Sequence, residues 1–96
     1  MISPKYTQKI KSTISSFDPQ RENKYFLFGS ATRKEKFGDV DVGVMGNARS
    51  AKNLADLREQ FEESTLPYFV DVVDFDAASS EFTEYVRSAE NLVWLN

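Results

Sequence analysis

The stretch Tyr25-Phe26-Leu27-Phe28-Gly29-Ser30, followed by Asp39-Val40-Asp41, decides how the rest of this 96-residue chain is interpreted. It combines an apolar strand, a Gly-Ser turn and a second strand that carries two acids at alternate positions. Side chains two residues apart on a strand point to the same face of a sheet, so Asp39 and Asp41 share a face. The valines that alternate with them point to the opposite face, which is the predicted core: Val40, Val42 and Val44.

A second acid-bearing strand, Phe-Val-Asp-Val-Val-Asp over residues 69–74, follows about thirty residues later. By the same alternation, Asp71 faces the same way as Val73 and the opposite way to Val72. An aspartate inside an otherwise aliphatic strand costs free energy unless it is paired or bound to a metal ion. Two strands that offer carboxylates beside a Gly-Ser turn form a layout suited to a divalent metal and a polyphosphate.

The composition excludes several kinds of chemistry. The net charge of −3 gives no bulk basicity, so direct binding of nucleic acid is not expected. The chain has no histidine, which excludes a histidine base or ligand, and oxygen ligands favour Mg²⁺ or Mn²⁺ over Zn²⁺. It has no cysteine, as expected of a protein in the reducing cytoplasm. No apolar run approaches the roughly 20 residues that span a bilayer, so no membrane partner is expected.

Hydrophobic spacing and breaker residues predict alternating helices and strands. Ser3-Pro4 is a helix start signal with a capping hydroxyl, and Asp18-Pro19 is a stop signal. We expect helices over 4–17, 50–64 and 80–88, and strands over 24–28, 39–45, 68–74 and 92–95. This order predicts a single domain over 1–96 of the α/β or α+β class, with a mixed sheet of about four strands flanked by helices. The short link between the first two strands allows them to be antiparallel neighbours.

Each motif also has a plainer interpretation. The acids Asp39 and Asp41 are either a metal-binding pair or the polar outer face of an amphipathic strand. Gly29-Ser30 is either an anion-binding nest or an ordinary turn. Neither the Walker spacing nor the dinucleotide-binding spacing is present around it. The apolar segment 92–95, with Trp94, is either a contact patch for a partner or an inner strand packed on the third helix.

Basic residues follow the Gly-Ser turn at Arg33, Lys34 and Lys36. If this loop borders the site, one or two of them would meet a triphosphate. Arg33 is the preferred candidate, because a guanidinium forms a bidentate fork with phosphate oxygens. The alternative is a basic turn that is exposed to solvent.

Taken together, these motifs resemble the nucleotidyltransferase fold of the polymerase-beta-like superfamily, and specifically its minimal nucleotidyltransferase (MNT) type. The resemblance covers almost the whole chain and is carried by three segments: Phe28-Gly29-Ser30, 39–44 and 70–74. The chain departs from the family pattern between the turn and the first acid. Only eight residues, 31–38, separate Ser30 from Asp39, which is fewer than is usual. Lys34-Glu35 stands where the family often has glycine, and Gly38 stands where it often has serine.

The resemblance implies an activity and a set of site residues. It implies transfer of a nucleoside monophosphate from an NTP, with ATP favoured, to an acceptor hydroxyl. Asp39, Asp41 and Asp71 would hold two Mg²⁺ ions and form the catalytic centre. Gly29, Ser30 and Arg33 would bind the triphosphate.

The resemblance also implies a partner. The chain ends where larger relatives add a domain for the acceptor, so the acceptor surface is expected to come from another protein. In the MNT type this is a HEPN-domain toxin, and the MNT protein is the antitoxin of the pair. The shortened loop favours an alternative, a weakly active or inactive module that binds nucleotide or partner and neutralises the toxin by occlusion. A third interpretation is an α/β domain with acidic strand ends and no ligand. The sequence does not decide between a homo-oligomer and a hetero-oligomer.

Overall fold

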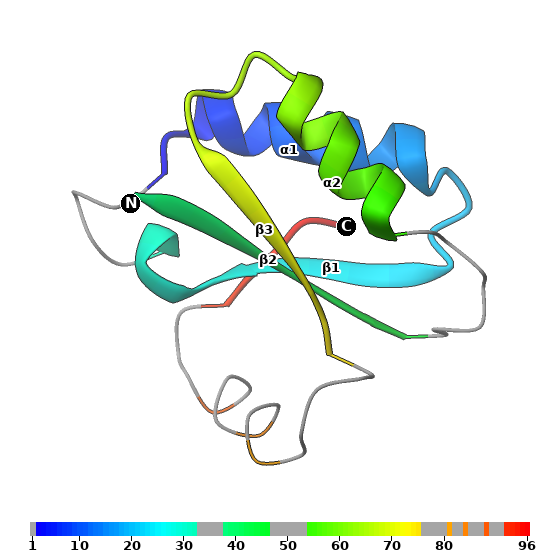
Figure 1. Ribbon diagram of the computed structural model, residues 1–96. Coiled ribbons are helices and arrows are strands. Elements are labelled where there is room, and N and C mark those ends of the chain that lie inside the picture. Colours follow the sequence, from blue (N-terminus) through cyan, green and yellow to red (C-terminus); the bar gives the residue numbers. More distant parts are fainter. Residues whose placement is uncertain are drawn as a thin grey trace.

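A computed structural model describes residues 2–32, 38–46, 54–75 and 92–96, together with Glu81, Glu84 and Ser88. Its elements, in chain order, are α1 (Pro4–Phe17), β1 (Asn23–Phe28), the 3₁₀ turn η1 (Gly29–Thr32), β2 (Asp39–Gly46), α2 (Leu54–Glu63), β3 (Phe69–Asp74) and β4 (Val93–Trp94) (Figure 1). Over the described ranges, these elements comprise two α-helices, one 3₁₀ turn and a four-stranded mixed sheet. The α+β class predicted from the sequence is therefore confirmed, with strand boundaries displaced by about one residue.

The strands lie in the order β3-β2-β1-β4. β1 is antiparallel to both of its neighbours, β2 and β4, whereas β2 and β3 run parallel. The antiparallel pairing of the first two strands is as predicted. Among the described strands β4 pairs with β1 alone and is an edge strand of the sheet, while Leu95 next to it is buried in the core. The predicted packing of segment 92–95 on the third helix lies outside the described residues.

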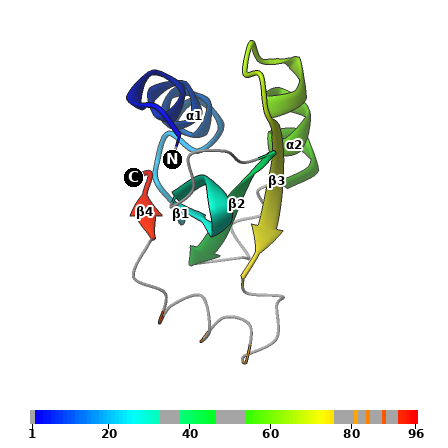
Figure 2. The same cartoon turned by 90° about the vertical axis from the view of Figure 1, so that its left-hand side faces the viewer.

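Both helices cover the same face of the sheet, as Figure 2 shows. α1 buries Ile10 and Ile14, and α2 buries Leu57 and Phe61. These side chains join the inward-facing residues of the strands in one cluster, which includes Tyr25, Leu27, Val40, Val42, Val44, Val70 and Val72. The predicted core face of the second strand is therefore confirmed. Burial of this apolar face is what holds α1 and α2 against the sheet.

The other face of the sheet carries a smaller aromatic cluster. Phe26 is fully buried there and lies opposite Gly43 in the β1–β2 ladder. Its ring makes edge contacts with Phe75 at a centroid distance of 4.9 Å and with Trp94 at 5.4 Å. A Cβ at position 43 would collide with the Phe26 ring, so glycine is required for this packing. The cluster adjoins the acids of β2 on this face, because Phe28, whose ring contacts both Phe26 and Phe75, is the register partner of Asp41.

One detail of the first helix differs from the sequence prediction. Ser3 is the N-cap residue, in extended conformation, but its hydroxyl makes no capping hydrogen bond. Its carbonyl instead accepts hydrogen bonds from the Thr7 amide at 3.0 Å and the Thr7 hydroxyl at 3.1 Å. Because Pro4 presets the first helical φ and has no amide proton, the helix starts here without help from the Ser3 hydroxyl.

Several sequence predictions fall outside the described residues. These are the basic loop that contains Arg33, the first residues of the predicted helix 50–64, and most of the predicted helix 80–88. Three residues within that last range are described, and all three are helical: Glu81, Glu84 and Ser88. Within the described ranges, no helix combines the length and the apolar character needed to cross a bilayer.

Candidate functional site

Asp41 and Asp71 are direct neighbours across two parallel strands. They are register partners in the β2–β3 ladder, so both side chains leave the sheet on the same face. Asp39 lies two residues before Asp41 on β2 and shares that face. The structure thus brings the two acid-bearing strands together, on the face opposite α1 and α2.

The electrostatics of Asp41 reflect this crowding of carboxylates. Asp41 is half-buried, whereas Asp39 and Asp71 are exposed. Burial raises the pKa of the Asp41 carboxyl above its ordinary value, and the nearby charges of Asp71 and then Asp39 raise it further. A carboxylate held among like charges is one that a bound cation would stabilise strongly.

Gly29 lies directly against the Asp41 carboxylate. β1 ends at Phe28, the register partner of Asp41, and the chain then turns through Gly29 with a φ of +79°. A Cβ built on Gly29 would lie 2.6 Å from Oδ2 of Asp41. The 3₁₀ turn that follows is closed by the Thr32 hydroxyl, which donates a 2.8 Å hydrogen bond to the Gly29 carbonyl. Glycine is therefore required twice, for its backbone conformation and for its close approach to the acid.

The remaining predicted site residues stand as follows. Ser30 lies within η1, immediately after Gly29, but its side chain is outside what the structure describes. Arg33 lies outside the described residues altogether. The structure therefore brings Gly29, Ser30 and the three acids to one end of the sheet, and it leaves the position of Arg33 open.

The donor set suits a hard divalent cation. The three acids supply only oxygen atoms, which Mg²⁺ prefers to the nitrogen and sulfur ligands of Zn²⁺. In the described part of the chain, however, no three acidic side chains form a ready-made metal site. Asp41 and Asp71 are adjacent by register, and the side chains of Asp39 and Asp71 are exposed. The residues fit a Mg²⁺ site that also takes oxygen atoms from a phosphate ligand.

Sequence reasoning missed one residue on this face. Phe69 is the register partner of Asp39 and lies two residues before Asp71, so its ring shares the acidic face. It is 59% exposed, one of two large hydrophobic side chains that are exposed within the described ranges. The alternation that places Asp71 and Val73 on one face of the strand places Phe69 on that face as well. The sequence therefore contained a signal that could have identified Phe69.

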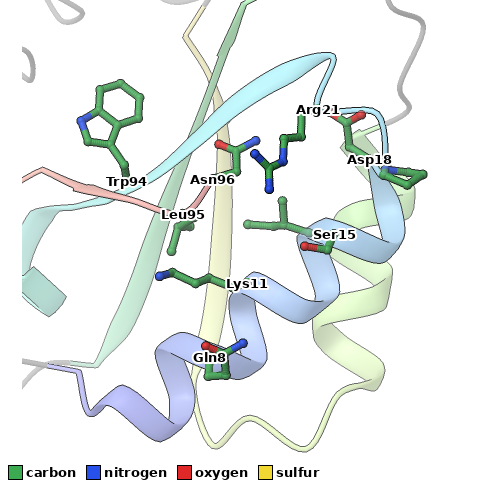
Figure 3. A pocket seen from close by; sticks show the side chains of 10 residues that line it. Gln8, Lys11, Ser15, Asp18, Arg21, Trp94, Leu95 and Asn96 are labelled. Carbon is green, nitrogen blue, oxygen red and sulfur yellow. The ribbon is translucent and has the colours of Figure 1, made fainter.

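A separate pocket of about 630 Å³ lies on the helix side of the molecule. Figure 3 shows Lys11 and Ser15 entering it from α1, Arg21 from the loop after α1, and Asn96 from the end of the chain. None of the predicted site residues lines it. The acidic site on the opposite face of the sheet is thus distinct from this pocket.

Comparison with known families agrees with this geometry. The family model described as "Polymerase beta, Nucleotidyltransferase" matches residues 8–96. The fold and the acid-bearing strands define a nucleotidyltransferase domain, and the chain belongs to the polymerase beta nucleotidyltransferase family. No curated protein matches the chain.

Proposed function

We propose that this chain transfers a nucleoside monophosphate, AMP in the favoured case, from an NTP to an acceptor hydroxyl, with two Mg²⁺ ions held by Asp39, Asp41 and Asp71. The observation that carries the proposal is the register of Asp41 with Asp71, beside the Gly29 turn. Family membership supports the class of reaction. The oxygen-only donor set supports Mg²⁺.

Each residue has a defined task in this reaction. Backbone amides of the Gly29-Ser30 turn bind the β- and γ-phosphates, because no side chain at position 29 blocks their approach. Mg²⁺, when bound, neutralises phosphate charge and lowers the pKa of the acceptor hydroxyl. Asp39 and Asp41 hold the ions, and Asp71 holds the ion on the acceptor side and accepts the hydroxyl proton.

The atoms balance without another reactant. The acceptor oxygen forms a bond to the α-phosphorus, and the bond from that phosphorus to the oxygen that bridges to the β-phosphate breaks. Pyrophosphate leaves with the electron pair of the broken bond, and the hydroxyl proton passes to the Asp71 carboxylate. The contribution of the protein is positioning and electrostatic stabilisation.

We further propose that the acceptor belongs to a HEPN-domain protein for which this chain is the antitoxin. The likeness of the Gly-Ser and Asp-x-Asp segments to the minimal nucleotidyltransferase type supports this finer assignment. The eight-residue interval between Ser30 and Asp39 favours a second candidate, a module that binds nucleotide and partner without turnover. In that case the partner is neutralised by occlusion.

The first prediction separates these functions. The chain is incubated with α-labelled ATP, Mg²⁺ and a HEPN-domain protein, and covalent label on that protein is measured. We expect label with the wild-type chain and a loss of at least about 100-fold in Asp41→Asn, because Asp41 lies at the centre of the proposed metal site.

The matched control for this assay is Asp74→Asn. Asp74 lies on β3 and points to the face opposite Asp71, since it pairs with the core-facing Val44. We expect Asp74→Asn to keep wild-type transfer. Binding of ATP and partner without label would support the occlusion function, and label that survives in Asp41→Asn would rule out the proposed catalytic centre.

A further inference from the structure

Two cations line the pocket beside α1, and neither has a partner within the described ranges. The other cations of those ranges are engaged with an aromatic ring or a hydrogen-bond acceptor: Lys5, Lys9, Lys24 and Arg58. The side chains of Lys11 and Arg21 have no such contact and no ion pair there, and both face the same cavity of about 630 Å³. The pocket therefore gathers the positive charge that the described part of the chain leaves unpaired.

The carboxylate on the lining does not cancel this charge. Asp18 is 2% exposed, and its oxygens accept hydrogen bonds from two backbone amides and from the Tyr25 hydroxyl. With Asp18 counted, the side chains of the lining carry a net charge of +1, from two cations and one carboxylate. The whole chain carries −3, so this pocket differs in sign from the molecule around it.

The segment that carries Arg21 is held in place by hydrogen bonds. Arg21 has a φ of +54°, the only positive φ of a non-glycine residue in the described ranges. Its amide donates a 3.1 Å hydrogen bond to the Asp18 carbonyl, and the Asp18 carboxylate binds the next two amides. A left-handed backbone at a residue with a Cβ costs free energy, and such residues cluster at binding sites. The turn thus presents the Arg21 side chain to the pocket (Figure 3).

A second part of the lining is equally well fixed. The Asn96 side chain accepts a 3.0 Å hydrogen bond from the Tyr25 amide and donates a 2.9 Å hydrogen bond to the Asn23 carbonyl. Two buried side chains, Ile14 and Leu95, supply apolar surface to the same lining. The pocket therefore combines fixed walls, an apolar portion and two cations.

Charge and size together indicate the class of ligand. A phosphate monoester carries between about one and a half and two negative charges at pH 7, which the two cations match. The guanidinium of Arg21 forms a bidentate fork with phosphate oxygens, and Lys11 adds a point charge. The volume lies within the range of roughly 300–1,000 Å³ that is usual for sites of small organic ligands. Space for an organic group therefore remains beside the phosphate.

We infer that this pocket binds a small organic phosphate monoester, with the phosphate at Lys11 and Arg21 and the organic group against Ile14 and Leu95. The site is formed by α1, the loop that follows it and the residues 94–96. It uses none of the acids of β2 and β3, so binding here needs no Mg²⁺. The inference is independent of the proposed function.

Nuclear magnetic resonance of the ¹⁵N-labelled full chain tests the site directly. The probe is phenyl phosphate, titrated in EDTA so that no Mg²⁺ recruits phosphate to the acidic site. Inorganic phosphate and phthalate are titrated in parallel, because one lacks the ring and the other replaces the phosphate with two carboxylates. We expect saturable shifts of the Ser15, Arg21 and Asn96 amides, with phenyl phosphate binding at least about threefold more tightly than either comparison ligand.

Two substitutions remove the cations one at a time. Arg21→Gly removes the guanidinium, and glycine adopts the positive φ without strain, so the variant is expected to fold normally. We expect Arg21→Gly and Lys11→Gln each to weaken binding of phenyl phosphate at least about fivefold. Lys5→Gln is the matched control, since it makes the same change of charge on α1 outside the pocket. It is expected to keep wild-type affinity.

Several results would overturn the inference. Unchanged affinity in both pocket variants would do so, and so would shifts centred on the Gly29 turn. Equal binding of phthalate would refute the phosphate assignment, and equal binding of inorganic phosphate would refute the organic group. Asp41→Asn is expected to lose transfer and to bind phenyl phosphate as wild type does, so the pocket and the proposed catalytic centre can fail separately.

Discussion

At the scale of single residues, the candidate site depends on the contact between Gly29 and Asp41. The positive φ of Gly29 and the 2.6 Å approach of a hypothetical Cβ to Oδ2 of Asp41 both exclude a larger residue. The sequence predicted a turn at this position and a role for glycine in phosphate binding. It did not predict that the same glycine makes room for a carboxylate on the next strand, because that contact forms only when β1 and β2 pair.

The second prediction concerns Gly29→Ala. We expect this change to destabilise the chain by at least about 1–2 kcal/mol, the cost of a left-handed conformation in a residue with a Cβ. Displacement of the Asp41 carboxylate should also lower transfer. Urea unfolding measures the stability change, with Gly38→Ala as the control, because a Cβ there meets no atom within 4 Å. Equal stability of the two variants would contradict the prediction.

The third prediction follows from the pKa of Asp41. Its folded-state pKa is raised above the ordinary value of 3.8, so the folded chain holds this proton more tightly than the unfolded chain. The contribution of Asp41 to stability therefore falls as the pH rises from about 3.8 through the raised pKa. We expect Asp41→Asn to be at least as stable as wild type at pH 7 in EDTA.

Thermal unfolding from pH 3 to 8 measures this effect. The stability advantage of Asp41→Asn should shrink as the pH falls through the raised pKa towards 3.8, and it should level off below 3.8, where the wild-type carboxyl is protonated in both states. A variant that is clearly less stable than wild type at pH 7 would show that the carboxylate contributes a favourable interaction.

At the scale of elements, the junction of α1 with β1 is held by a buried carboxylate. Asp18 is 2% exposed and accepts hydrogen bonds from the Glu22 amide at 3.0 Å, the Asn23 amide at 2.9 Å and the Tyr25 hydroxyl at 3.0 Å. Burial is the main cause that raises the pKa of Tyr25, so its hydroxyl stays a donor at neutral pH. The sequence predicted only that Asp18-Pro19 ends the helix.

The fourth prediction is that Asp18→Ala destabilises the chain by about 2–4 kcal/mol, because three donors would lose their acceptor at a buried position. Chemical denaturation measures the loss. Glu59→Ala on the exposed side of α2 is the control and should stay within about 0.5 kcal/mol of wild type. A loss below about 1 kcal/mol for Asp18→Ala would mean that water replaces the carboxylate as acceptor.

At the scale of the whole molecule, one core joins α1, α2 and all four strands of the sheet. The cluster includes Ile10 from α1, Leu57 from α2 and Leu95 next to β4, each of which is buried. Elements from both ends of the chain therefore share the same interior. This arrangement supports the proposal that residues 1–96 form a single domain.

The fifth prediction is that the chain unfolds as one cooperative unit. Far-UV circular dichroism reports α1 and α2, and fluorescence of Trp94 reports the packing of β4 on β1. Because these elements share one core, the two transitions should coincide in urea. Separate midpoints would show that the C-terminal strand detaches before the helices unfold, and would contradict the single-domain proposal.

The sequence by itself determined the elements and their faces. The apolar spacing of α1 and the alternation in β2 and β3 are local properties, and they predicted which side chains are buried and that Asp39 shares a face with Asp41. The absence of histidine and cysteine determined that any metal ligand must be oxygen. Only the tertiary structure decided that Asp41 pairs with Asp71, that Phe69 lies beside Asp39, and that Gly29 contacts the Asp41 carboxylate. The reason is physical: register between strands far apart in the chain is set by the packing of the whole sheet against the helices, and local spacing does not encode it.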